Sequence, residues 1–186
     1  MPIVEPSRCA DRPRRNRLRG QRGFTLIELI MVIVLMGVLA VVAAPRIFNS
    51  SDFYARGFHD ETLGLLRYSQ KTAIAQRRTV CVTFTNSGAE TSVALTMASA
   101  AATSDCSVAS TPALAGPRGE VPAKVAARAG VVFATTPSNF NYDGLGQPIA
   151  ASGGAAMSTR TLQVASASGN ASASITVEAA TGYAHE

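Results

Sequence analysis

Two sets of side chains in this sequence could do chemistry outside an ordinary folded core. The first is a single carboxylate, Glu28, which is the only charged group between Phe24 and Ala44. An ionised carboxylate inside an apolar helix costs on the order of 3 kcal/mol in lipid, so we expect it to have a dedicated cationic partner. The second set is a pair of thiols, Cys81 and Cys106.

The apolar run from Phe24 to Ala44 must position Glu28. As a helix it would be about 30 Å long, which matches the hydrocarbon core of a bilayer. Basic flanks stay on the cytoplasmic side of a membrane, so the remainder of the chain is expected outside. The basic residues before the run are Arg8, Arg12, Arg14, Arg15, Arg17, Arg19 and Arg22.

The cysteines divide between the two ends of this run. Cys9 precedes it, whereas Cys81 and Cys106 follow it and would be exported together. An even pair in an oxidising compartment indicates a disulfide, and two separate buried thiols are the alternative. No Cys-x-x-Cys pair or histidine-rich cluster accompanies them, so no metal site is expected.

The residues around Glu28 follow a specific order. A basic stretch ends at Gly23, and Phe24-Thr25-Leu26-Ile27-Glu28 then opens an apolar run that closes at Pro45. This order resembles the class III signal of type IV pilins and of type II secretion pseudopilins. The resemblance implies that a prepilin peptidase cuts after Gly23 and N-methylates the new first residue, Phe24.

The same resemblance implies a role for Glu28. In the family, the acid at this position pairs with the terminal amine of a neighbouring subunit, here the amine of Phe24. An amine and a carboxylate that are both stranded in lipid are each costly, and pairing across subunits relieves both. We therefore expect Glu28 to be the assembly residue.

Two simpler interpretations of the N-terminus compete with this one. A basic region followed by an apolar run also describes a secretory signal or a plain membrane anchor, and Ala43 and Ala44 could serve a signal peptidase. Neither alternative requires Gly-Phe-Thr-Leu-Ile-Glu, and the run is longer than the usual signal core. A mature N-terminus at Phe24 favours the pilin-like interpretation, and one near Pro45 contradicts it.

Beyond the run, residues 45–78 predict the second half of one long helix. Pro45 removes a helical hydrogen bond, so it predicts a kink. Small or apolar residues then recur at spacings of three and four, which predicts one stripe packed on a sheet. The stripe comprises Ala55, Phe58, Thr62, Leu65, Leu66, Ser69, Ala73 and Gln76; Asp60, Glu61, Arg67, Lys71 and Arg78 are expected mostly to face away.

After Arg78 the period changes to two, which predicts strands. Residues 79–85 and 90–98 form a predicted hairpin that turns at residues 86–88. Residues 99–127 are rich in Ala, Ser, Pro and Gly, so we expect a long irregular loop there. Further strands are expected at 131–134, 161–167 and 174–178, with turns at 141–148 between two of them.

A second resemblance concerns the branch of the family. Residues 52–82, with Ala-Arg-Gly-Phe, Ala-Ile-Ala-Gln-Arg-Arg and Val-Cys-Val, resemble H-type pseudopilins and FimT-like proteins, most closely minor pilins of the mannose-sensitive haemagglutinin (MSHA) pilus. Residues 140–148 and a final Thr-Gly-Tyr turn match only loosely.

Composition argues against catalysis and against nucleic-acid binding. The net charge of +5 belongs to residues 1–23, while the remainder balances ten basic against ten acidic residues. The late cations are scattered, so no basic patch is predicted. The only histidines are His59 and His185, and no nucleophile elbow or phosphate loop accompanies them. No enzymatic activity and no cofactor are expected.

The sequence therefore predicts an α+β protein with a type IV pilin-like fold, in which a long N-terminal helix packs on an antiparallel sheet. Residues 1–23 are a cleaved leader, 24–44 a transmembrane half-helix, 45–78 an amphipathic half-helix and 79–186 a periplasmic β domain. We expect a single-pass inner-membrane protein with a cytoplasmic N-terminus, which becomes extracellular in a pilus. Expected partners are prepilin peptidase, major and minor pilins or pseudopilins, and the inner-membrane assembly platform.

Three functions remain open from the sequence. The chain could be a minor pilin of MSHA type, an H-type pseudopilin of a type II secretion system, or a FimT-like minor pilin that binds DNA. A neutral mature charge argues against the third. Neighbouring genes would separate the three.

Overall fold

The computed structural model describes residues 23–47, 50–88, 90–101, 103, 106–107, 109–110, 113–152, 154–166 and 171–186. The chain divides into two compact units, residues 1–45 and 46–186. Helix α1 (Leu26–Ile47) lies almost wholly in the first unit, and helix α2 (Ser50–Gln76) and all the strands lie in the second.

The second unit contains two antiparallel sheets. The first has the strand order β3-β2-β1-β5-β6, and the second has the order β4-β7-β8-β9. In the first sheet the strands are β1 (Val80–Ser87), β2 (Glu90–Met97), β3 (Lys124–Ala126), β5 (Phe140–Tyr142) and β6 (Pro148–Ala150). In the second they are β4 (Val131–Phe133), β7 (Arg160–Ser166), β8 (Ala171–Val177) and β9 (Ala184–His185).

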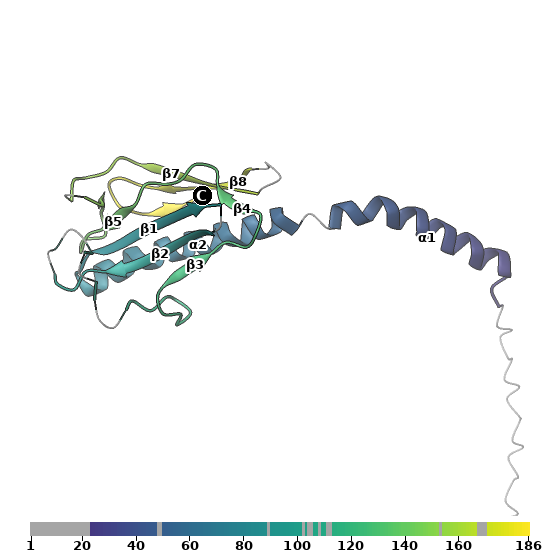
Figure 1. Cartoon of the computed structure of the whole chain (residues 1–186), viewed down its shortest axis with the longest axis horizontal. Helices are drawn as coiled ribbons and strands as arrows, with labels where there is room; N and C mark the ends of the chain where they lie inside the picture. Colours follow the sequence, from purple (N-terminus) through teal and green to yellow (C-terminus); the bar gives the residue numbers. More distant parts are fainter. Residues whose placement is uncertain are drawn as a thin grey trace, which may run out of the picture. The chain divides into compact units, whose positions relative to one another are not determined.

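Helix α2 packs against strands of both sheets, and Figure 1 shows it running along them. The predicted stripe from Ala55 to Ala73 is buried, whereas Gln76 at the end of the helix is exposed. The buried face is wider than predicted, because a helix that contacts two sheets must cover more than one narrow stripe. His59 and Leu63 are the additional buried residues.

A chain of aromatic rings connects the helix with both sheets. The ring of Phe133 in β4 lies 5.4 Å from that of Phe58 in α2 and 5.6 Å from that of Phe84 in β1. Phe140 then stacks 6.0 Å from Phe84 and meets Tyr142 at 5.3 Å. Aromatic pairs at such distances add about 0.5–1.5 kcal/mol beyond their burial. The core is thus shared between the two sheets.

This arrangement confirms the α+β class, with a helix packed on antiparallel β-structure, but the β-structure differs from prediction in detail. The hairpin of β1 and β2 is where it was expected, whereas the strands form two sheets rather than one. The predicted loop 99–127 contains β3, and β5, β6 and β9 were also not predicted. These strands have only two or three residues, too few for a two-residue period to be recognised.

The boundaries of the helices also differ from those predicted. Helix α1 continues through Pro45 to Ile47, α2 begins at Ser50, and residues 48–49 lie outside the described residues. Helix α2 ends two residues before the expected position because Arg77 takes a left-handed conformation, with φ of +51°. The backbone N–H of Arg78 then donates to the carbonyl of Ala73 at 3.2 Å, which satisfies a group at the helix end.

Candidate functional site

The residues expected at the processing site lie at the start of α1. Gly23, Phe24 and Thr25 precede the helix and are exposed. The hydroxyl of Thr25 accepts a hydrogen bond from the backbone N–H of Glu28 at 3.3 Å. Thr25 is therefore the N-cap of α1, and a Thr-x-x-Glu sequence is a helix start signal in its own right.

Glu28 lies in the first turn of α1, where the helix dipole favours a negative charge. Its side chain is exposed. Among the residues that the structure describes, no hydrogen bond or ion pair involves the Glu28 carboxylate. The group is thus available to a cation from another molecule.

The rest of α1 presents large apolar side chains to its surroundings. A helix that is apolar on every side requires a nonpolar environment, such as other protein surfaces or lipid. Within the described residues, no helix meets the combined length and hydropathy needed for a membrane span. The exposed apolar residues of this segment are Phe24, Leu26, Ile27, Leu29, Ile30, Met31, Val32, Ile33, Val34, Leu35, Met36, Val38, Leu39 and Val41.

Pro45 is a helical residue of α1. Its side chain and residues 48–49 lie outside what the structure describes. The expected kink at Pro45 therefore remains a prediction.

Two of the three cysteines are joined. Cys81 in β1 and Cys106 in the segment after β2 form a disulfide with an S–S distance of 2.07 Å across 25 residues of chain. The Sγ of Cys106 also lies 3.6 Å from the carbonyl oxygen of Thr96. The disulfide thus holds the segment after β2 against the end of the hairpin.

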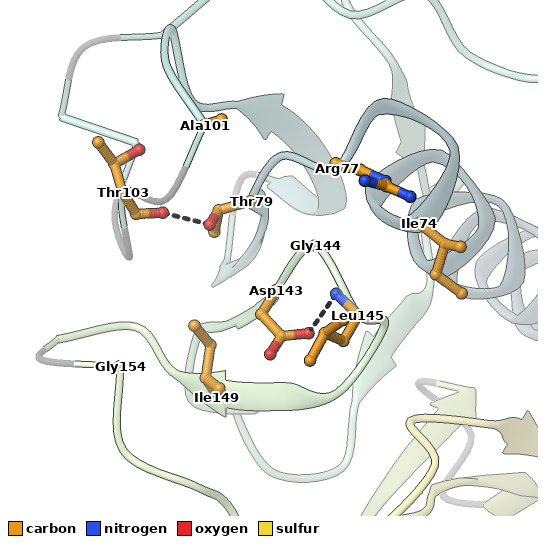
Figure 2. Close-up of a pocket in the computed structure, with 10 residues that line it drawn as sticks. All are labelled: Ile74, Arg77, Thr79, Ala101, Thr103, Asp143, Gly144, Leu145, Ile149 and Gly154. Carbon is orange, nitrogen blue, oxygen red and sulfur yellow. Dashed lines mark hydrogen bonds between the residues drawn. The ribbon is translucent and has the colours of Figure 1, made fainter.

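A pocket of about 880 Å³ lies beside this segment, at the end of α2. We call it the distal pocket. Figure 2 shows Ile74 and Arg77 from the helix end on one side and Asp143 and Leu145 from the turn after β5 next to them. Thr79 and Thr103 lie across from this turn, and the Thr79 hydroxyl donates to the Thr103 carbonyl.

The turn after β5 is fitted closely to the end of α2. The carboxylate of Asp143 accepts from the backbone N–H groups of Leu145 at 2.9 Å and Gln147 at 2.8 Å. A Cβ on Gly144 would lie 3.0 Å from the carbonyl carbon of Arg77, so a larger residue there would crowd the helix end. The turn that lines this side of the pocket is therefore held by its own hydrogen bonds and lies against the helix end.

Three further side chains form a small group of potential metal ligands. His59 is 2% exposed, its Nδ1 lies 3.0 Å from Asp60 Oδ1, and its Nε2 is buried with no partner among the described residues. His59, Asp60 and Glu186 each place one ligand atom within 4.8 Å of the others. Ligands of a common zinc ion are about 4 Å apart at most, so this group would have to contract before it could hold one.

The second histidine lies in the same part of the fold. His185 Nε2 is 3.0 Å from Glu178 Oε1, and Arg67 of α2 donates to the carbonyl of Ala184 at 2.8 Å. The hydrogen bond with Glu178 raises the pKa of His185. Arg67 was expected to face away from the sheet, and it instead reaches β9, a strand that the sequence did not predict.

The sequence-predicted residues fall into two places. Gly23, Phe24 and Glu28 lie together at the start of α1, and Cys81 and Cys106 lie together in the second unit. Sequence reasoning missed the distal pocket, although turns were expected at residues 141–148, where the turn that lines it lies. The sequence Gly144-Leu145-Gly146 marks the turn that lines one side of the pocket, but it carries no sign of the helix end and the segment after β2 that line the other sides.

A scan against protein-family models matches residues 18–44 to the prokaryotic N-terminal methylation motif. The match contains Gly23, Phe24 and Glu28. It covers α1 as far as Ala44 and leaves the second unit unmatched.

Several curated proteins are similar to part of the chain. It is 47% identical over 36 residues to a type II secretion system core protein G of Klebsiella michiganensis, covering 19% of this chain and 25% of that protein. It is 45% identical over 56 residues to a type IV major pilin protein PilE1 of Neisseria gonorrhoeae, covering 30% and 32%. It is 37% identical over 57 residues to the type IV narrow pilus major component PilA5 of Thermus thermophilus, covering 31% and 49%.

The matches thus span between a quarter and a half of these relatives' lengths. No solved structure matches the chain significantly. The three relatives are pilus or secretion-system components. The chain carries the N-terminal methylation motif and is similar, over part of its length, to type IV pilins and to a type II secretion core protein.

Proposed function

We propose that this chain is a pilin-like subunit that is processed after Gly23, methylated on Phe24 and assembled into a thin fibre through Glu28. The methylation motif at residues 18–44 and the partial similarity to pilins support this proposal. The peptidase that cuts the leader would be a separate protein, so this chain is a substrate and a building block.

The exposed Glu28 carboxylate carries the proposal. It sits in the first turn of an apolar helix and has no partner among the described residues of its own chain. A charge in such surroundings is strongly stabilised when it meets an opposite charge in a shared apolar environment. The amine released by cleavage before Phe24, on a neighbouring subunit, supplies that charge.

The remaining parts of the chain follow from this role. Residues 1–23 are the cleaved leader, residues 24–44 anchor the chain in the inner membrane, and residues 45–78 continue as an amphipathic helix. Residues 79–186 lie in the periplasm and become extracellular in a pilus. The partners are prepilin peptidase, other pilins or pseudopilins and the inner-membrane assembly platform.

Within this class we propose a minor pilin of MSHA type, similar to MshC. The support is the sequence resemblance of residues 52–82, with Ala-Arg-Gly-Phe in the first half of α2 and Val-Cys-Val at the start of β1. A pseudopilin of a type II secretion system is the second candidate, because of the 47% identity to a core protein G over 36 residues. Adhesive-pilus genes beside this one would favour the first, and secretin and secretion ATPase genes the second.

The test compares processing and assembly in cells. Mass spectrometry of the mature chain should find methylated Phe24 as its first residue. Glu28→Val should leave cleavage intact and abolish incorporation into sheared fibres. Leu29→Val, which alters the neighbouring side chain without touching the charge, should assemble normally. Normal incorporation of Glu28→Val, or a chain never cut at Gly23, would refute the proposal.

A further inference from the structure

Helix α2 carries a hollow at each of its two ends. The distal pocket lies at its last turn, and a groove of about 340 Å³ lies at its first turns, beside Phe53, Tyr54, Gly57, Glu61 and Arg128. We call the second hollow the proximal groove. At 1.5 Å per residue, Phe53 and Ile74 are about 32 Å apart along the helix, which Figure 1 shows within the second unit. The two hollows therefore lie at opposite ends of α2.

Each hollow has a large apolar side chain left in the open. Phe53 is 76% exposed at the proximal groove, and Leu145 and Ile74 are 79% and 48% exposed at the distal pocket. An aromatic side chain such as Phe53 can bury about 150–250 Å² when it is covered. The distal pocket, at about 880 Å³, has room to receive it.

The charges at the two ends are complementary. The proximal groove has the anion Glu61 and the cation Arg128, whose guanidinium lies 4.9 Å from the ring centre of Tyr54. The distal pocket has the cation Arg77 and the anion Asp143. If one end faces the other, Glu61 can meet Arg77 and Arg128 can meet Asp143.

Glu61 already forms an ion pair within its own chain, but this pair does not prevent it from meeting Arg77 of another copy. Glu61 lies 3.1 Å from Arg118, and the two side chains are 43% and 66% exposed. An exposed ion pair of this kind contributes little, so Glu61 can leave Arg118 for a better-shielded partner. Among the residues that line them, each hollow has one anion and one cation, so the linings themselves have no net charge to attract an anionic lipid surface.

We propose that the distal pocket of one copy receives the proximal end of α2 of a second copy, with Phe53 against Leu145 and Glu61 against Arg77. The two surfaces differ, so the contact is head-to-tail and continues from copy to copy as an open row. The contact is small, and interfaces below about 1,000 Å² are weak on their own. It therefore rests on the proposed function, in which anchoring in the inner membrane raises the local concentration of copies.

Cysteine cross-linking of the full chain in cell membranes tests the contact. In a Cys9→Ser background, a chain with both Phe53→Cys and Leu145→Cys should give a ladder of cross-linked oligomers under mild oxidation. Phe53→Cys with Gln163→Cys is the matched control, because Gln163 is exposed on β7 and lines neither hollow. It should give no ladder. Equal ladders from the two variants, or none from the first, would overturn the proposal.

A charge exchange gives a second, independent measurement. Arg77→Glu or Glu61→Arg alone should reduce the ladder about tenfold, because like charges then face each other. The double variant should restore it, and failure to restore it would contradict the pairing of Glu61 with Arg77.

The proposed contact and the proposed function can fail separately. A processed chain that enters fibres through Glu28 but gives no ladder refutes only the contact. A ladder from a chain that is never processed refutes only the assembly role.

Discussion

The phenol of Tyr142 donates a hydrogen bond to the carbonyl of Gly182 at 3.1 Å. Tyr142 belongs to the first sheet, and Gly182 lies in the turn between β8 and β9 of the second. Gln70 of α2 adds two bonds at the same place, to the carbonyls of Gly146 at 3.2 Å and Thr181 at 2.5 Å. Helix and both sheets are thus joined by polar contacts close to the distal pocket.

Replacing Tyr142 by phenylalanine tests the strength of this junction. Tyr142 is fully buried, and its burial raises the pKa of the phenol. Loss of the hydroxyl leaves the Gly182 carbonyl without this donor, so Tyr142→Phe should lower the free energy of unfolding by about 1–3 kcal/mol. Circular dichroism during denaturation of the full chain in detergent measures it. An unchanged midpoint would contradict a structural role for this bond.

Gly182 should tolerate no side chain. A Cβ there would lie 2.2 Å from the carbonyl oxygen of Gly146, and φ is +70°, which disfavours other residues. We expect Gly182→Ala to destabilise the protein by about 2 kcal/mol or more. Gly64→Ala is the matched control: nothing lies within 4 Å of its Cβ position in α2, so it should stabilise by about 0.5–1 kcal/mol. If both variants changed the free energy of unfolding in the same direction, the proposed steric and backbone cause at Gly182 would be ruled out.

The parts of the fold that could be predicted are those whose pattern is local. Val80, Val82 and Phe84 alternate with polar residues, and all three are buried in β1. The buried stripe of α2 repeats every three or four residues. In both elements the period of burial can be recognised from neighbouring residues alone.

The parts that could not be predicted depend on contacts between distant residues. Gln70 and Thr181 are 111 residues apart, and neither carries a local sign of the other. The end of α2 was misplaced because Arg77 occupies a left-handed position that is usually held by glycine. The distal pocket forms only when the helix end, the turn after β5 and the disulfide-linked segment meet, so no single stretch of sequence predicts it.

Removing the disulfide should loosen one wall of the distal pocket and destabilise the second unit. Cys81→Ala with Cys106→Ala should lower the free energy of unfolding by about 2–4 kcal/mol, because the 25-residue separation is no longer closed in the unfolded chain. Reductant should lower the melting temperature of the parent chain and leave the variant unchanged. An equal change of the melting temperature in both chains on adding reductant would show that the reductant does not act through this disulfide.

Stability should fall with rising pH because of His185. Its pKa is raised, first by the hydrogen bond with Glu178 and then by the backbone oxygen of Glu186, while nearby Arg67 opposes the shift. The folded state therefore holds this proton more tightly than the unfolded chain. The resulting stabilisation is fully present below the unfolded pKa of about 6.5, and is lost as the pH rises through the raised folded value.

Glu178→Gln isolates this effect, because the amide keeps the size of the side chain and an acceptor oxygen but loses the charge. Melting temperatures of the full chain in detergent, measured at intervals between about pH 5.5 and pH 8.5, should decline in the parent chain across the titration of His185. The decline should be smaller in Glu178→Gln and absent in His185→Ala over the same range. His185 and Glu178 are both partly exposed, so high salt should also reduce the decline of the melting temperature with pH. An identical pH profile in all three chains would show that the pair of His185 and Glu178 does not stabilise the fold.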